Sequence, residues 1–191
     1  MSVGYYNENA QSYFDSTVLA DMQTLRDSFL KHVRQGGAIL DAGCGSGRDA
    51  KAFADAGYAV TAFDASAEMV RLACQHTGLP VHHMTFEQMD WQDKFDGIWA
   101  CACLLHVDRT DLPGIFVQFA RALARGGNWY FSIKHGNTTR ELDKRTFTDV
   151  TETEVRDLLE AAGLGVRDIW MTADVRPGRL DLWVNALAIK A

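Results

Sequence analysis

The chain has 191 residues, which suits one compact domain with a real hydrophobic core. Hydrophobic residues make up 47% and charged residues 23%, as in soluble globular proteins. A net charge of −6 without a Lys/Arg run argues against a nucleic acid partner. No apolar run approaches the ~18 residues that suggest a membrane span. We therefore expect one domain over residues 1–191 and no membrane segment.

The four cysteines are typical of a reducing compartment. Cys101 and Cys103 lack the spacing of a CxxC redox or zinc pair, and no other ligand cluster has suitable spacing for a metal. We expect small buried thiols rather than disulfides. The first residues lack the basic and apolar segments of a signal peptide. The sequence therefore predicts a cytoplasmic protein without a metal.

In chain order, the first expected element is a helical cap within residues 1–35. Apolar residues at three- and four-residue steps predict one helix face through 10–33: Leu19, Met22, Leu25, Phe29 and Val33. Gly36 and Gly37 end this helix. A short apolar strand over 38–40 follows, and after a glycine loop comes a helix over 48–55.

Strands and helices then alternate, which predicts an α/β protein with a mostly parallel sheet. Ser66 is an N-cap candidate for the next helix. The segment 95–102 is almost continuously apolar, as expected of a strand buried on both faces. The expected strands are 59–63, 81–84, 95–102 and 128–133, and the expected helices are 66–76 and 109–124.

The C-terminal part begins with a polar segment, 134–150, which we interpret as a loop. Residues 135–150 would form a lid or substrate loop over a site. Thr151 starts a helix over 151–162 with a capping-box pattern. Two last strands, 165–171 and 180–189, would form a hairpin around the turn residues 176–179.

The glycine loop between the first strand and its helix is the main sign of a ligand. It reads Asp41-x-Gly43-x-Gly45-x-Gly47. Glycines allow the backbone to turn sharply and approach a ligand, and the helix start offers free N–H groups. This environment suits an adenosine-containing ligand.

The residues around the loop bear on which ligand it binds. The nicotinamide fingerprint GxGxxG/A requires a small residue at position 48, where this chain has Arg48. An acid at position 41 would repel a pyrophosphate and attract an ammonium group. Asp64 ends the second strand, where an acid can accept hydrogen bonds from both ribose hydroxyls. The alternative is an Asp that merely starts the turn 64–66.

With these motifs the chain resembles the class I S-adenosylmethionine-dependent methyltransferases, in particular the small methyltransferase-11/12 and tellurite-resistance-like types. The resemblance spans about residues 5–132 and rests on four segments: ILDAGCGSGRDA, VTAFDAS, FDGIWACACLLHV and RALARGGNWYFS. It implies a Rossmann-like sheet of seven mostly parallel strands, with an antiparallel last strand and helices on both faces. It also implies S-adenosylmethionine as cofactor and a small-molecule acceptor whose identity the sequence leaves open.

The resemblance implies a set of cofactor-binding positions. The loop would hold the methionyl part, Asp64 the ribose, and two following residues the adenosine. The loop after the third strand would line the adenine, and the end of the fourth strand would lie near the sulfonium. Two N-terminal tyrosines would cover the sulfonium. The positions are Asp41, Gly43, Cys44, Gly45, Gly47, Asp64, Ala65, Met69, Thr85, Phe86, Glu87, Ala100, Tyr6 and Tyr13.

His106 follows the fourth strand and borders the active site in the family, where it would act as a base or form a structural wall. Arg48 would bind a carboxylate or cap the lid, although an ordinary solvent-exposed arginine is the simpler expectation. The lid contains a basic group that would suit an acidic small molecule, although a solvated charged loop is the simpler interpretation: His135, Asn137, Arg140, Lys144 and Arg145. Two other functions stay open, a non-catalytic S-adenosylmethionine-binding protein and a nicotinamide-dependent oxidoreductase.

Overall fold

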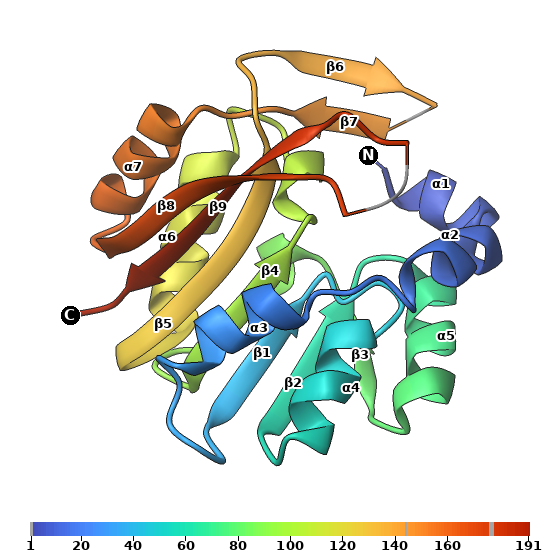
Figure 1. Ribbon diagram of the computed structural model, residues 1–191, viewed down its shortest axis with the longest axis horizontal. Helices are drawn as coiled ribbons and strands as arrows, with labels where there is room; N and C mark the ends of the chain where they lie inside the picture. Colours follow the sequence, from blue (N-terminus) through green and yellow to red (C-terminus); the bar gives the residue numbers. More distant parts are fainter. Residues whose placement is uncertain (1, 144, 176–177) are drawn as a thin grey trace.

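The computed structural model of the protein describes residues 2–143, 145–175 and 178–191. A seven-stranded sheet forms its centre, in the order β3-β2-β1-β4-β5-β9-β8 (Figure 1). The first five of these strands run parallel, and β9 runs antiparallel to both β5 and β8. The predicted fold class is confirmed. The strands are β1 Ala38–Ala42, β2 Ala59–Asp64, β3 Val81–His83, β4 Phe95–Cys101, β5 Leu123–Lys134, β8 Gly165–Ala173 and β9 Leu182–Ile189.

The central strands are buried on both faces because helices cover both sides of the sheet. Alternate residues of β1 and β4 belong to two different core clusters, with Leu40 and Ile98 in one and Ile39 and Trp99 in the other. The helices α6 (Leu112–Ala122) and α7 (Glu152–Ala161) contribute to the first cluster, and α3 (Gln23–Leu30) and α4 (Arg48–Asp55) to the second (Figure 1).

The N-terminal cap consists of short helices rather than the expected continuous one. They are α1 (Val3–Glu8), α2 (Ala10–Thr17) and α3. The chain leaves the helix after Thr17, whose hydroxyl donates to the Tyr13 carbonyl at 2.8 Å, and Leu19 is 90% exposed. The prediction of one continuous helix face through residues 10–33 was therefore wrong, because Leu19 does not pack against the core.

The segment after β5 is more ordered than the loop that its polar composition predicted. Strands β6 (Thr139–Leu142) and β7 (Arg145–Thr148) pair antiparallel as a separate hairpin, which we call the lid hairpin.

The expected helix over 109–124 begins at Leu112 and ends at Ala122. Strand β5 starts at once, with Gly126 inside it at φ +77°, so this glycine does not separate the two elements.

The predicted helix caps and the C-terminal hairpin agree with the structure. Ser66 accepts a hydrogen bond from the Met69 N–H at 3.2 Å and caps α5 (Ala67–Thr77), and Thr151 caps α7 in the same way. Strands β8 and β9 form the predicted antiparallel hairpin, although positions 176 and 177 of its turn lie outside the described residues. No helix among the described residues is long and apolar enough to cross a membrane.

Candidate active site

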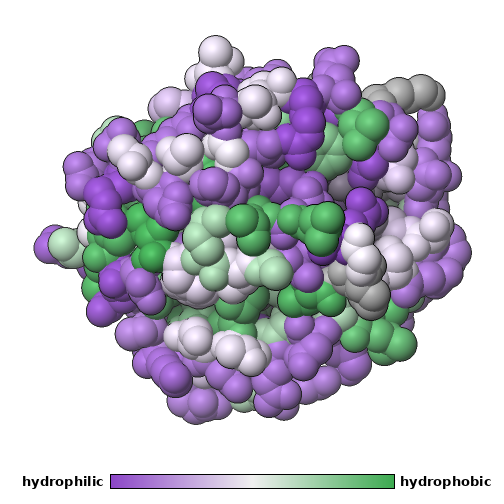
Figure 2. Space-filling model, turned by 45° about the horizontal axis from the view of Figure 1, so that its top comes forward, coloured by the Kyte–Doolittle hydropathy of each residue, from purple (hydrophilic) through white to green (hydrophobic). Residues whose placement is uncertain are grey.

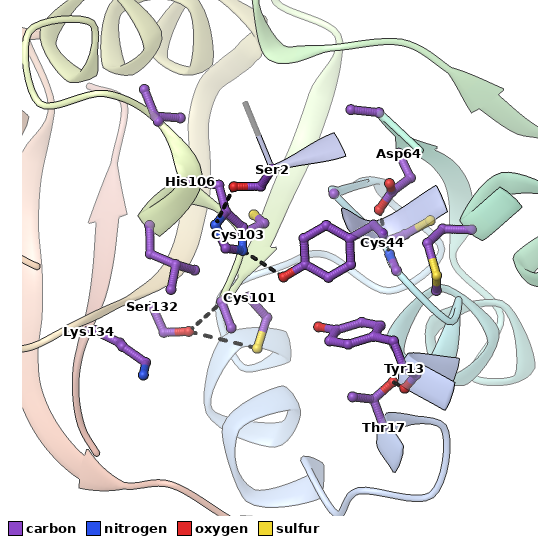
Figure 3. A pocket seen from close by; sticks show the side chains of 18 of the residues that line it. Ser2, Tyr13, Thr17, Cys44, Asp64, Cys101, Cys103, His106, Ser132 and Lys134 are labelled. Atoms are coloured by element: carbon purple, nitrogen blue, oxygen red, sulfur yellow. Dashed lines mark hydrogen bonds between the residues drawn. The ribbon is translucent and has the colours of Figure 1, made fainter. Parts of the chain in front are cut away.

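A cavity of about 580 Å³ lies where the parallel strands β1, β2 and β4 end. This is the usual place for ligands in open α/β sheets, and the volume falls in the range of small-molecule sites. Figure 3 shows Asp64 and Cys44 on one side of the cavity, and His106, Ser132 and Lys134 on the other. The site therefore has two halves, one built by the glycine loop and one by β5 and the segments after it.

The glycine loop takes a course that its glycines make possible. Gly43, Gly45 and Gly47 all have positive φ angles, at +67°, +53° and +75°. A Cβ atom on Gly43 would lie 2.7 Å from the Cβ atom of Cys103. The loop thus packs directly against the segment that follows β4, and both line the cavity.

Asp41 lies at the end of β1 and lines the cavity, although only 3% of the residue is exposed. Its Oδ2 atom has no hydrogen-bond partner in the part of the chain that the structure describes. Burial raises the pKa of this carboxyl well above its usual value, and the nearby Asp49 charge adds to this effect, while Arg48 opposes it. An unpaired buried carboxyl oxygen at a cavity wall suits a ligand that carries a cation.

Asp64 ends β2, and backbone N–H groups fix its carboxylate. Oδ2 accepts from Gly45 N–H and Oδ1 from Ser66 N–H, both at 2.9 Å. Burial raises the pKa of Asp64, and these hydrogen bonds partly offset that increase. The Ser66 hydroxyl donates to Asn7 Oδ1 at 2.7 Å, which ties α1 to this wall. Each carboxylate oxygen keeps a further lone pair for a ligand hydroxyl.

Most of the predicted cofactor-binding residues lie in the wall of this one cavity. They are Asp41, Gly43, Cys44, Gly45, Asp64, Ala65, Met69, Thr85, Phe86, Glu87, Tyr6 and Tyr13. Two are placed elsewhere. Ala100 is fully buried in the core, and Gly47 starts α4, where a Cβ atom would lie 2.6 Å from the Thr77 methyl group. Phe86, on the short helix η1 (Phe86–Gln88), also packs against the core.

His106 lies on the short helix η2 (Leu104–His106) and faces the cavity between α1 and the lid hairpin. Its Nδ1 atom is 2.8 Å from the Thr146 carbonyl, so we assign the ring proton to Nδ1. The Tyr6 hydroxyl is 2.7 Å from Nε2 and donates to it. Burial lowers the pKa of His106 to about 4, with smaller contributions from the charges of Arg145 and Lys134. The imidazole is therefore neutral at pH 7.

A buried ionic cluster joins α3, α4 and β4 beneath the cavity. Asp49 accepts from Arg26 at 2.8 Å, from Arg48 at 2.6 Å and from the Trp99 indole at 3.0 Å. Arg48 also donates to the Thr17 carbonyl at 3.3 Å. The expectation of an exposed Arg48 was wrong, since 19% of its side chain is accessible. No local sequence signal predicts this cluster, because Arg26 is 23 positions from its carboxylate partner.

The second half of the cavity contains residues that the sequence did not single out. Ser132 near the end of β5 accepts a hydrogen bond from the Ala102 N–H at 2.9 Å, and Lys134 pairs with Asp181 at 2.8 Å. Of the predicted basic group, Arg140 and Arg145 line the cavity. His135 lies 3.5 Å from Glu152, and position 144 lies outside the described residues.

Comparison with known families agrees with this geometry. The family described as "Methyltransferase domain" matches residues 39–127, from β1 to the start of β5. The central part of the chain is thus similar to a methyltransferase domain. No group of three or more His, Cys, Asp or Glu side chains that could hold a metal occurs among the described residues.

Individual relatives place the chain within a broad family. It is 33% identical over 121 residues to the ubiquinone biosynthesis O-methyltransferase of Methylocella silvestris, a match that covers 60% of this chain and 46% of the relative. The chain spans about half the length of the curated relatives it matches. In structure it is similar to the 1,6-didemethyltoxoflavin-N1-methyltransferase of Burkholderia thailandensis, with a TM-score of 0.80, 24% identity and coverage of 99% and 85%.

The fold alone does not set the reaction. The [4+2]-cyclase SpnF also shares it, with a TM-score of 0.74, 16% identity and coverage of 98% of this chain and 94% of that one. The activity of this protein must therefore be argued from its own cavity.

Proposed function

We propose that this protein binds S-adenosylmethionine in the glycine-loop half of the cavity and methylates a small molecule held in the other half. The observation that carries the proposal is the position of Asp41 and Asp64 in the wall of one cavity. Asp41 offers an unpaired buried carboxyl oxygen, and Asp64 offers a carboxylate oriented by two backbone donors. The same cavity extends to Ser132 and Lys134, which leaves a place for an acceptor beside the methyl donor.

The residues present fit the cofactor. Asp41 would bind the ammonium of the methionyl part and Asp64 the ribose hydroxyls, with Ala65, Met69 and the η1 residues around the adenosine. When bound, S-adenosylmethionine supplies a methyl group on a sulfonium, which is already a good leaving group. The protein's contribution is therefore alignment of the acceptor and exclusion of water.

His106 is proposed to orient the acceptor through Nε2, the atom that now accepts the Tyr6 proton. With its pKa lowered to about 4, His106 is a weak base at pH 7, so it accepts a hydrogen bond rather than storing a proton. The Thr146 carbonyl fixes the ring by holding Nδ1–H. An acceptor with a hydroxyl or N–H group can replace the Tyr6 hydroxyl at this atom.

We also propose that residues 1–191 work as one domain in the cytoplasm. The N-terminal helices, the lid hairpin and the C-terminal hairpin all contribute to the wall of one cavity. The four cysteines are free thiols, as is usual in a reducing compartment.

Calorimetric titration with S-adenosylhomocysteine tests cofactor binding. We expect the parent protein to bind it, and Asp64→Ala and Asp41→Asn to bind at least about tenfold more weakly, since hydrogen bonds to charged groups contribute roughly 1.5–3 kcal/mol. Asp55→Asn, which changes an exposed acid on α4, is the matched control and should bind like the parent. Undiminished binding by Asp64→Ala, or binding of NAD without S-adenosylhomocysteine, would contradict the proposal.

Turnover distinguishes an enzyme from a protein that only binds the cofactor. A screen of metabolite pools for S-adenosylhomocysteine formation should give a signal with the parent protein and a much smaller one with Asp64→Ala. Binding of S-adenosylhomocysteine without turnover across broad acceptor pools would instead favour the non-catalytic function.

A further inference from the structure

Four cationic side chains line the acceptor half of the cavity; Arg179 is exposed, and two of the three others already have anionic partners. Lys134 pairs with Asp181 at 2.8 Å, and Arg140 pairs with the buried carboxylate of Asp149. These two ion pairs leave little net charge. Asp174 also lines this half, and it accepts from the Trp183 indole at 3.3 Å.

Arg145 differs from Lys134 and Arg140. Its carboxylate contact is Asp143 at 3.4 Å, and 62% of the Asp143 side chain is exposed, so solvent screens this pair. By contrast, the Arg145 side chain is only 17% exposed. Its Nε atom is buried and finds no hydrogen-bond acceptor within the described part of the chain. A largely buried guanidinium with an unused donor at a cavity wall suits an anion from outside the chain.

Aromatic rings hold this guanidinium in position. Its central carbon lies 3.9 Å from the Tyr5 ring centroid and 5.0 Å from that of Phe147. Tyr5 belongs to α1 and Phe147 to β7, so both sides of the acceptor site hold Arg145. A preorganised planar fork of this kind matches a carboxylate, which it can bind with two parallel hydrogen bonds.

We infer that the acceptor of this methyltransferase carries a single carboxylate group, which binds Arg145. The inference rests on the proposed function, because it assigns the acceptor of the same site. One largely buried, incompletely paired cation matches a monoanion, whereas a phosphate group carries about −1.5 to −2 charges and would also draw on the exposed Arg179.

The neighbours of Arg145 also indicate the rest of the acceptor. Thr146, the next residue, holds His106 through its carbonyl, so a carboxylate on Arg145 places the acceptor's body beside His106 Nε2. Leu142 and Val175 line the cavity and are each 55% exposed, which makes its opening apolar. Figure 2 shows hydrophobic side chains gathered across the middle of a face whose rim is mostly hydrophilic. An apolar or aromatic carboxylic acid suits this surface.

Matched pairs of probes test the inference by ligand-observed NMR titration in the presence of S-adenosylhomocysteine. The probes are benzoate and 4-hydroxybenzoate, with benzamide and 4-hydroxybenzamide as their uncharged counterparts and phenyl phosphate as the dianion. We expect the parent to bind each acid at least about tenfold more tightly than its amide, since the acid adds a charge-assisted hydrogen bond. Arg145→Gln should lose this preference and Arg145→Lys should retain part of it.

Arg71→Gln is the control, because it removes an exposed arginine on α5 that pairs with Glu68 and does not line the cavity. It should keep the acid preference. Equal binding of acids and amides to the parent, or an unchanged preference in Arg145→Gln, would overturn the inference. Tighter binding of phenyl phosphate than of benzoate would overturn the assignment to a carboxylate. S-adenosylhomocysteine binding is measured on the same samples. If the parent binds S-adenosylhomocysteine but shows no preference for acids over amides, the acceptor inference is rejected and the proposed cofactor binding is not.

Discussion

His106 shows how the fold can prepare one residue for the proposed acceptor. Its Nδ1–H is held by a backbone carbonyl, and its Nε2 accepts from Tyr6. Burial also raises the pKa of Tyr6, so the tyrosine keeps its proton and remains a donor. His106 Nε2 is therefore kept as a hydrogen-bond acceptor in a buried part of the cavity wall.

The lowered pKa of His106 predicts a loss of stability in mild acid. An unfolded histidine titrates near 6.5 and the folded one at about 4, so the unfolded state binds more protons in between. The neutral ring's contribution is fully present above pH 6.5 and is lost as pH falls towards 4. A shift of this size corresponds to roughly 3 kcal/mol.

Urea unfolding at pH 7 and pH 4.5 measures this effect. The parent should lose more free energy of unfolding between these pH values than His106→Gln does, and the difference isolates His106 from other titrating groups. An identical pH dependence in the two proteins would show that His106 is not buried as a neutral ring.

At the scale of elements, the Asp49 cluster fixes α3 and α4 against β4. Asp49→Asn would keep the shape of the side chain but leave Arg26 and Arg48 without a counter-charge. Breaking a buried ion pair in this way costs about 3–5 kcal/mol, whereas an exposed pair contributes about 0–1 kcal/mol. Chemical denaturation should therefore show a large loss for Asp49→Asn. Asp55→Asn, which breaks the exposed pair with Lys51, should change little; equal effects of the two variants would contradict the structural role of the cluster.

The sequence predicts those elements whose signal is local. The continuous apolar run of β4 and the position of Asp64 after β2 predicted a buried strand and a cavity residue, and both agree with the structure. The lid hairpin was missed because its strands have only four residues each and a polar composition. The Asp49 cluster and the contact of Arg145 with Tyr5 join distant segments, so no periodicity or motif predicts them.

At the scale of the whole molecule, the helices α1 and α2 are held more weakly than the sheet. Tyr6, Tyr13 and Phe14 pack against a small cluster that includes Met69 and Leu72, separate from the two clusters of the sheet. Elements with few buried apolar contacts open more readily than a core. The helices that cover the proposed cofactor site are thus free to open without unfolding the sheet.

Hydrogen exchange tests this difference. In the free protein, amides of α1 and α2 should exchange faster than those of β1 and β4. S-adenosylhomocysteine at about 100 times its Kd should slow the helical amides by up to about 100-fold, since a ligand that binds only the closed state stabilises it by about 2.7 kcal/mol. Equal protection of helices and sheet in the free protein, or no change on adding the ligand, would contradict a weakly held cap.

The lid hairpin leaves the sheet after β5 and returns before α7, and β6 and β7 pair only with each other. Its exchange would replace the Thr146 carbonyl that holds His106 and the Arg145 side chain that contacts Tyr5, and would leave the glycine loop unchanged. A lineage that replaced these few residues could change the acceptor it recognises while inheriting the same donor chemistry. Grafting hairpins from other members of the family would be a short route to new acceptor specificity on this scaffold.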